Sequence, residues 1–200
     1  MSIVRMKNME LQEEKQTNEK QRRFGLELLD FVKILLVCFI VAFGIKTFIA
    51  RPVFVEGSSM YPTLQDGEFG FTNLLGLSLE GVNRGDIVIV EEGDEYWVKR
   101  VIGLPNETIE CRDNVVYING EALDESYLDS DYVHDIENNQ GYFTSDFEAI
   151  ELGSDEYFVM GDNRVVSADS RVVGPFSRSQ IVGKGVLVLM PLDQIGYKNQ

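Results

Sequence analysis

The sequence predicts a mostly β protein, built from antiparallel sheets or a partly open barrel, that follows a single N-terminal transmembrane helix. After residue 51, short segments rich in Val, Ile, Tyr and Phe alternate with turn residues, and helical periodicity is weak. Before them, residues 28–50 form one long apolar stretch. These observations divide the chain into a polar tail (residues 1–27), an anchor (residues 28–50) and a β domain (residues 51–200).

Residues 28–50 predict the membrane anchor. Their apolar centre is short, but 23 residues can span a ~30 Å hydrocarbon core if Asp30, Lys33 and Lys46 reach toward the headgroups. A buried core helix and a cleaved signal peptide are the alternatives. Because no Ala-x-Ala cleavage site follows the stretch, we favour an uncleaved anchor.

The charges predict the orientation of this anchor in the cell membrane. Seven Lys and Arg lie in residues 1–33, whereas the next one after Arg51 is Arg84. By the positive-inside rule, the tail is cytoplasmic and residues 51–200 are extracytoplasmic. The net charge of −15 divides into +2 for residues 1–50 and −17 for the rest. The domain therefore offers no basic surface for nucleic acid.

The β domain begins where Pro52 is expected to end the helix. Asn119-Gly120 is a signal for a tight hairpin turn. We expect strands at residues 53–55, 69–72, 86–91, 96–103, 108–110, 115–118, 157–160 and 185–190.

Residues 121–156 differ in composition from the rest of the domain. They hold 12 acidic residues, the single His and no Lys or Arg, so we expect a solvated surface insertion. A calcium loop beginning at Asp129 is the alternative, but Val133 occupies a ligand position and His134 replaces the required glycine. We therefore expect His134 in an exposed loop.

The counts of His and Cys exclude several metal sites. One His excludes HExxH sites and paired-histidine zinc fingers, and two Cys cannot build an all-cysteine zinc site. We expect no metal and no cofactor. Cys38 lies in the expected anchor and Cys111 in the domain, so no disulfide is expected between them.

A Ser-Lys pair is the best candidate for catalysis, because the only His lies in the acidic segment. Such a lysine must be neutral, so apolar burial must lower its pKa from ~10.4. Lys198 lies in a polar tail, and Lys184 lies between two glycines in an expected turn. Lys99 lies in an expected strand, with Trp97 and Val101 on its face. A solvent-exposed lysine on an edge strand is the alternative.

Two further segments are rich in small polar residues. Residues 57–64 read Gly-Ser-Ser-Met-Tyr-Pro-Thr-Leu and can expose a hydroxyl beside backbone N–H groups. A plain turn before Pro62 is the alternative. Residues 160–171 combine Gly, Ser, Asp, Asn and Arg, and a loop tied by its own Asp–Arg pairs is the alternative there.

Four motifs follow the anchor in a fixed order. They are Ser-Met-x-Pro-Thr at residues 59–63, Arg-Gly-Asp at 84–86, Val-Lys-Arg-Val-Ile-Gly-Leu-Pro at 98–105, and Gly-Asp-Asn-Arg-x-x-Ser-x-Asp-Ser-Arg at 161–171. The ordered set resembles type I signal peptidases over about residues 28–190, in the compact form of Gram-positive bacteria. The resemblance implies a membrane-anchored serine endopeptidase that cleaves N-terminal signal peptides from secreted preproteins with a Ser-Lys dyad.

The same resemblance implies roles for five residues. Ser59 would be the nucleophile and Lys99 the general base. Ser167 would hydrogen-bond and orient the Lys99 amine. Asp169 and Arg171 would pair and hold that loop in place.

The resemblance also implies how the substrate is bound. The backbone N–H of Ser59 would be one oxyanion donor, whereas Gly57 stands where some relatives carry a second donor, a serine hydroxyl. A preprotein with small residues before the cut would add as an extended strand. Six residues would line its apolar pockets, although about half could be ordinary core: Val53, Val55, Met60, Leu64, Trp97 and Val98.

The expected partners are secretory preproteins, membrane lipid and the secretion machinery. Residues 74–77 form an apolar loop that would touch the outer membrane leaflet, with a core segment as the alternative. A non-catalytic anchored relative and a self-cleaving regulator are the competing classes. Both Ser59 and Lys99 are present, which disfavours the first, and residues 1–50 offer no DNA-binding domain for the second. The sequence does not separate a housekeeping enzyme from a dedicated one.

Overall fold

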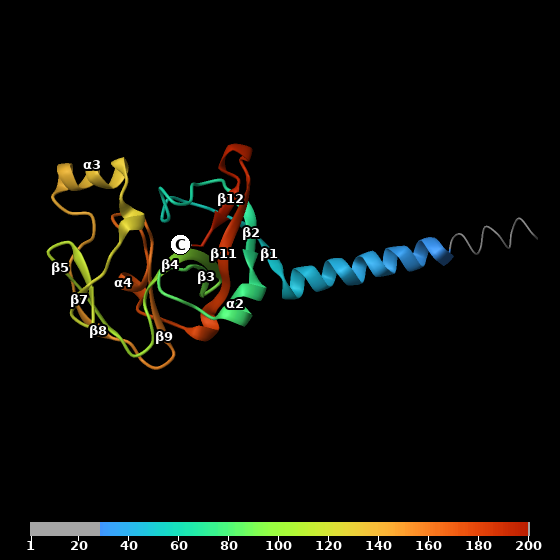
Figure 1. Ribbon diagram of the computed structural model, residues 1–200, viewed down its shortest axis with the longest axis horizontal. Helices are drawn as coiled ribbons and strands as arrows, with labels where there is room; N and C mark the ends of the chain where they lie inside the picture. The colour runs from blue at the N-terminus through green and yellow to red at the C-terminus, as the bar shows by residue number, and fades with distance from the viewer. Residues whose placement is uncertain (1–28, 200) are drawn as a thin grey trace, which may run out of the picture. The chain divides into compact units, whose positions relative to one another are not determined.

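The computed structural model describes residues 29–199, so the expected tail at residues 1–27 lies outside the described residues. The chain divides into two compact units, Met1–Thr47 and Phe48–Gln200. In the first, a helix at Leu29–Phe48 has a mean hydropathy of 2.2 and is long and apolar enough to cross a membrane (Figure 1). The expected apolar helix is confirmed. It ends before Pro52, which lies in the first strand instead.

The second unit is mostly β, as the sequence predicts. Its strands are β1 (Ala50–Phe54), β2 (Phe69–Asn73), β3 (Ile87–Glu92), β4 (Glu95–Gly103), β5 (Thr108–Arg112), β6 (Val115–Ile118), β7 (Glu121–Ala122), β8 (Phe147–Glu151), β9 (Glu156–Met160), β10 (Phe176–Ser177), β11 (Ile181–Met190) and β12 (Gly196–Lys198). The α-helices are α2 (Leu74–Glu80), α3 (Asp131–Gln140) and α4 (Ser170–Val173). Each of the eight expected strand segments overlaps an observed strand.

The strands form two antiparallel sheets. The larger has the order β1-β2-β11-β3-β4-β9-β10, with β12 also paired to β11, and the smaller has the order β7-β6-β5-β8. Strands β1 and β4 lie four places apart in the larger sheet, yet residues of both line one cavity. The larger sheet is therefore curled into a partly open barrel.

Strand β3 of the curled sheet is buried on both of its faces. Along β3, Ile87 and Ile89 pack into one apolar cluster, whereas Val88 and Val90 pack into another. A strand covered on both faces carries an unbroken apolar run rather than an alternating one. The run Ile-Val-Ile-Val therefore indicates a strand that is buried on both faces.

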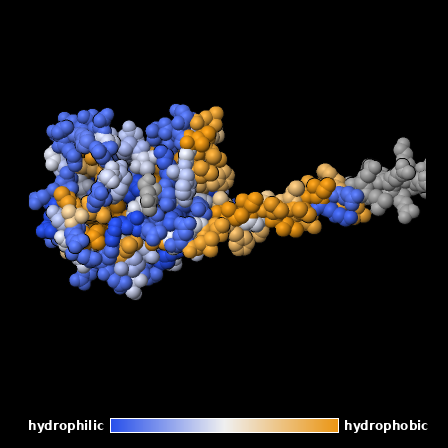
Figure 2. All heavy atoms as spheres, in the orientation of Figure 1, coloured by the Kyte–Doolittle hydropathy of each residue, from blue (hydrophilic) through white to orange (hydrophobic). Residues whose placement is uncertain are grey.

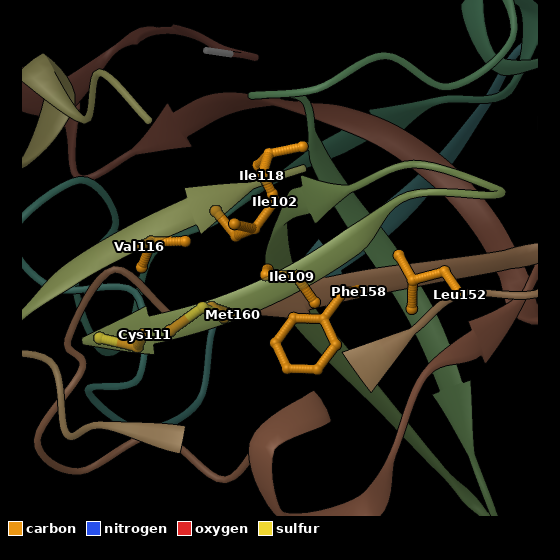
Figure 3. Packing of buried hydrophobic residues seen from close by; sticks show 8 residues of the cluster. All are labelled: Ile102, Ile109, Cys111, Val116, Ile118, Leu152, Phe158 and Met160. Carbon is orange, nitrogen blue, oxygen red and sulfur yellow. The ribbon is translucent and has the colours of Figure 1, made fainter. Parts of the chain in front are cut away.

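A third apolar cluster joins the two sheets. Figure 3 shows side chains from β5 and β6 facing side chains from β4 and β9. Its members are Ile102, Ile109, Cys111, Val116, Ile118, Leu152, Phe158 and Met160. Cys111 is buried there as a free thiol, and Cys38 is also free.

The structure differs from the sequence-based expectation at residues 74–77. The apolar loop expected at residues 74–77 is the start of helix α2, whose Leu74 and Leu77 are buried while Leu75 is exposed. Its amino terminus is capped by Asn73, whose side chain accepts a hydrogen bond from the Gly76 N–H.

The acidic segment at residues 121–156 is also more ordered than a solvated insertion. It contains β7, α3 and β8, and its Leu128, Val133 and Phe143 form a buried cluster. His134 is exposed, as expected, but it lies on α3 rather than in a loop. The sequence did not predict this helix, because acidic residues surround the few apolar positions that pack inward.

Candidate active site

Ser59 lies in the turn that follows β1. Gly57 has a φ of +81°, which only glycine adopts easily, and its N–H donates to an Asp66 carboxylate oxygen at 2.7 Å. The next residues anchor the turn, because Met60 and Leu64 are 1% and 0% exposed and belong to the core. The turn therefore presents Ser59 from a fixed backbone.

Lys99 lies beside Ser59 from a different element. It is on β4, only 4% exposed, and its Nζ is 2.8 Å from the Ser59 Oγ. Burial lowers the pKa of Lys99 to about 8, an effect that the Asp169 and Asp162 carboxylates oppose. A substantial fraction of this amine is therefore neutral near physiological pH.

Asp169 and Arg171 hold the loop beyond β9. Burial alone would raise the pKa of Asp169, but the Arg171 guanidinium outweighs burial and holds that pKa below its usual value. Arg171 Nη2 donates to Asp169 at 2.8 Å, and the same carboxylate accepts from the Gly161 N–H at 2.9 Å. These contacts tie the loop to the end of β9.

Ser167 lies in the same loop. A side chain at Gly161 would collide with both the Ser167 hydroxyl and the Ser59 carbonyl, so these two residues flank that glycine. The Ser167 hydroxyl donates weakly to the Ala168 carbonyl at 3.4 Å. Within residues 29–199 it makes no hydrogen bond to Lys99.

The six expected pocket residues fall into two groups. Val55, Met60 and Leu64 are buried in the core. The others are partly exposed along two cavities: Val53 and Val98 line one of about 300 Å3, and Trp97 lines another of about 620 Å3 together with Ser59 and Lys99.

Lys184 is a buried lysine that the sequence placed in a turn. It lies within β11 at 3% exposure, with its Nζ 2.9 Å from Asp86 and 3.3 Å from Glu80. Burial would lower its pKa, but these two carboxylates raise it above the usual value. Lys184 therefore remains charged, whereas a fraction of Lys99 is neutral.

The chain is similar to a known protein family. Residues 28–190 match the family described as signal peptidase, peptidase S26. The chain belongs to this signal peptidase family. It is 40% identical over 184 residues to signal peptidase I P of Bacillus subtilis subsp. natto, a match covering 90% of this chain and 98% of the relative.

Two other signal peptidases are similar to this chain over different shares of its length. Signal peptidase IB of Staphylococcus aureus (strain MRSA252) is 35% identical, with 86% of this chain and 94% of the relative covered. A crystal structure of a signal peptidase I from Enterococcus faecalis V583 is 32% identical, covers 52% of this chain and 95% of that chain, and superposes with a TM-score of 0.44.

Several residues around Ser59 and Lys99 were given no role by the sequence. Arg100 and Asp162 form a buried bidentate pair, with Nε–Oδ1 and Nη2–Oδ2 distances of 2.8 and 2.7 Å. Thr63 donates its hydroxyl to Asp162. Asn163 bonds the backbone of the Ser59 turn. The signal for this network was Arg100, a charged residue inside an apolar strand, because such a residue needs a buried partner.

Proposed function

We propose that this member of the signal peptidase family is a membrane-anchored signal peptidase I, and that it cuts N-terminal signal peptides from secreted preproteins with a Ser59-Lys99 dyad. The observation that carries the proposal is the 2.8 Å separation between the Ser59 Oγ and a Lys99 amine whose pKa burial lowers to about 8. A hydroxyl in contact with a partly neutral amine is an activated nucleophile.

The reaction would proceed through four proton transfers at Lys99, two in each half. The neutral amine takes the Ser59 proton as Oγ attacks the scissile carbonyl, and the resulting ammonium then protonates the departing amine. An ester joins Ser59 to the signal peptide at this stage. Lys99 next deprotonates a water molecule that attacks the ester, and it returns the proton to Ser59 as the signal peptide leaves.

Three residues of the loop after β9 support this dyad. Asp169 and Arg171 fix the loop through their ion pair. For Ser167 we propose an orienting hydrogen bond to the Lys99 amine, which requires its hydroxyl to turn away from the Ala168 carbonyl. The loop thereby restricts Lys99 to rotamers that reach Ser59.

The substrate would lie extended between β1 and β4. Val53 of β1 and Val98 of β4 line one shallow apolar cavity there, and Trp97 lines the neighbouring one that contains the dyad. A preprotein strand would bond main chain to main chain, as added strands do. Such cavities suit small apolar residues before the cut.

Membrane lipid would hold the enzyme near its substrates. The helix at Leu29–Phe48 would anchor it, with the basic amino-terminal side cytoplasmic and the β domain extracytoplasmic, where preproteins leave the secretion machinery. The domain also has an apolar face formed by neighbouring residues of β1, β2, β11 and β12, which are Phe54, Phe69, Phe71, Leu187, Met190 and Tyr197. Figure 2 shows apolar side chains on the side of the domain where β2, β11 and β12 lie.

Cleavage of a purified preprotein in detergent tests this proposal. Ser59→Ala removes the nucleophile and should lower kcat by about 10⁴-fold or more. Lys99→Arg keeps the charge but cannot deprotonate, so it should lose activity to a similar extent. Ser58→Ala, on the neighbouring exposed serine, is the matched control. Near-normal cleavage by Ser59→Ala or Lys99→Arg would show that the dyad is wrongly assigned.

A further inference from the structure

The helix of the acidic segment reaches the backbone that carries Ser59. Tyr132 lies in the first turn of α3, where the Ser130 side chain caps the helix by accepting from the Val133 N–H. Its hydroxyl donates to the Asn163 Oδ1 at 3.1 Å, and its ring packs edge-on against Tyr61 with centroids 4.7 Å apart. Tyr132 therefore contacts both loops that form the active site.

Asn163 transmits this contact to the nucleophile turn. It is 2% exposed, its backbone N–H donates to the Ser59 carbonyl at 3.0 Å, and its Nδ2 donates to the Ser58 carbonyl at 3.1 Å. An amide side chain can turn over and exchange its donor for its acceptor. The Tyr132 hydroxyl disfavours that exchange, because it donates to Oδ1 and thereby keeps Nδ2 directed at Ser58.

The Ser58 carbonyl in turn orients the Ser59 N–H. It accepts from the Asn163 Nδ2 and from the Tyr61 N–H at 3.1 Å, so its direction is fixed by two donors. In a trans peptide, the C=O of one residue and the N–H of the next point in opposite directions. Holding the Ser58 carbonyl with two donors therefore also fixes the direction of the Ser59 N–H.

The direction of this N–H matters more here because of Gly57. Residue 57 has no hydroxyl to assist an oxyanion, and the Ser59 N–H has no acceptor within residues 29–199. A donor that is aligned before the reaction stabilises a developing oxyanion without reorganising.

We infer that Tyr132 is a positioning residue for catalysis, acting through Asn163 and the Ser58 carbonyl to align the Ser59 N–H with the developing oxyanion. This inference rests on the proposed function. It gives the acidic segment a role in the reaction of the same chain.

Tyr132→Phe tests the inference because it removes only the hydroxyl and keeps the ring against Tyr61. We expect kcat for preprotein cleavage to fall about 10-fold, part of the loss that follows complete removal of an oxyanion donor, with KM changed less than about 2-fold. The pH at which activity is half-maximal should not move, since Lys99 is untouched. Tyr142→Phe is the matched control, because Tyr142 lies exposed in the same segment and should retain full activity.

A double variant separates positioning from a general loss of stability. Asn163→Ala removes the group through which Tyr132 acts, so adding Tyr132→Phe to it should lower kcat no further. If the kcat losses of the two single variants multiplied in the double variant, the inference would be overturned. The same would hold if Tyr132→Phe were as active as Tyr142→Phe, and the dyad assignment would remain intact in both cases. Full activity of Ser59→Ala would overturn both the inference and the dyad assignment, since the Ser59 hydroxyl would then not be the nucleophile that attacks the scissile carbonyl.

Discussion

At the scale of single residues, the domain contains two buried lysines whose pKa values are shifted in opposite directions. Lys99 has a hydroxyl partner at 2.8 Å, so burial dominates and lowers its pKa to about 8. Lys184 has Asp86 at 2.9 Å and Glu80 at 3.3 Å, so its pKa is raised. The partners of a buried lysine, more than its burial, decide whether it serves as a base or as a structural cation.

The lowered pKa of Lys99 predicts the pH dependence of cleavage. The amine accepts a proton only when it is neutral, so kcat/KM should rise through pH about 8 and level off above it. On the acidic side the rate should fall about tenfold per pH unit, as for one essential base. Initial rates from pH 6 to 10 in one detergent would measure the midpoint, with Ser58→Ala as the control. A flat profile through pH 6 to 9 would contradict a lysine base.

The second lysine predicts a stability effect. Asp86→Asn keeps the shape of the side chain but leaves Lys184 charged beside a neutral amide, with only the exposed Glu80 as a carboxylate partner. Breaking a buried ion pair costs about 3–5 kcal/mol of unfolding free energy, and this variant should approach the lower value because Glu80 remains. Denaturant unfolding in detergent would measure it. Lys184→Met added to Asp86→Asn should recover part of the loss, and no recovery would show that Asp86 acts mainly through other contacts.

At the scale of elements, buried charge joins the acidic segment to the loops of the candidate active site. Glu125 accepts from the Arg164 guanidinium, whose side chain is 0% exposed. Burial would lower the pKa of Arg164, but Glu125 raises it above the usual value. The guanidinium of Arg100 stacks on the Tyr127 ring at 4.1 Å from its centroid. The segment therefore supplies partners to two buried arginines, a carboxylate to Arg164 and an aromatic ring to Arg100.

The elements that the sequence predicted well have strong local patterns. The apolar run of β3 and the alternation around Lys99 in β4 are visible in a single stretch of chain. Helix α3 was missed because its inward side chains, such as Val133, are outnumbered by acidic and amide residues. Lys184 was misplaced because its flanking glycines read as a turn, whereas Gly183 lies against the Thr72 side chain and leaves no space for a Cβ.

In the candidate site, too, short motifs predict some residues, whereas the roles of others depend on contacts between distant parts of the sequence. Ser59 and Lys99 could be predicted from short motifs and the resemblance they carry. Asn163 and Tyr132 could not be assigned roles, because their contacts join residues 31 positions apart in the sequence, and Asn163 joins Ser58 across 105 positions. Only the three-dimensional arrangement of the sheet and α3 brings them together.

At the scale of the whole molecule, the β domain combines a high negative charge with one apolar face. The domain carries a net charge of −17, yet one of its faces is apolar along the β1, β2 and β11 register. Large exposed apolar patches mark sites of contact with proteins or membranes. Under the proposed anchoring, lipid lies within reach of this domain, so we expect this face to contact the bilayer in addition to the helix.

A fluorescent probe can test that contact in the full-length chain. In a Cys38→Ser background, Cys111 is 1% exposed and should resist labelling, so a new cysteine at Met190→Cys receives the polarity-sensitive probe. On transfer from buffered detergent to phosphatidylcholine–phosphatidylglycerol vesicles, its emission should resemble that of a probe in acyl chains, and brominated lipids should quench it. Val172→Cys is the matched control, because Val172 is 73% exposed but lies on α4 against β9. Quenching that is equally weak at both positions would mean that the apolar face does not touch lipid, and that the helix alone holds the enzyme at the membrane.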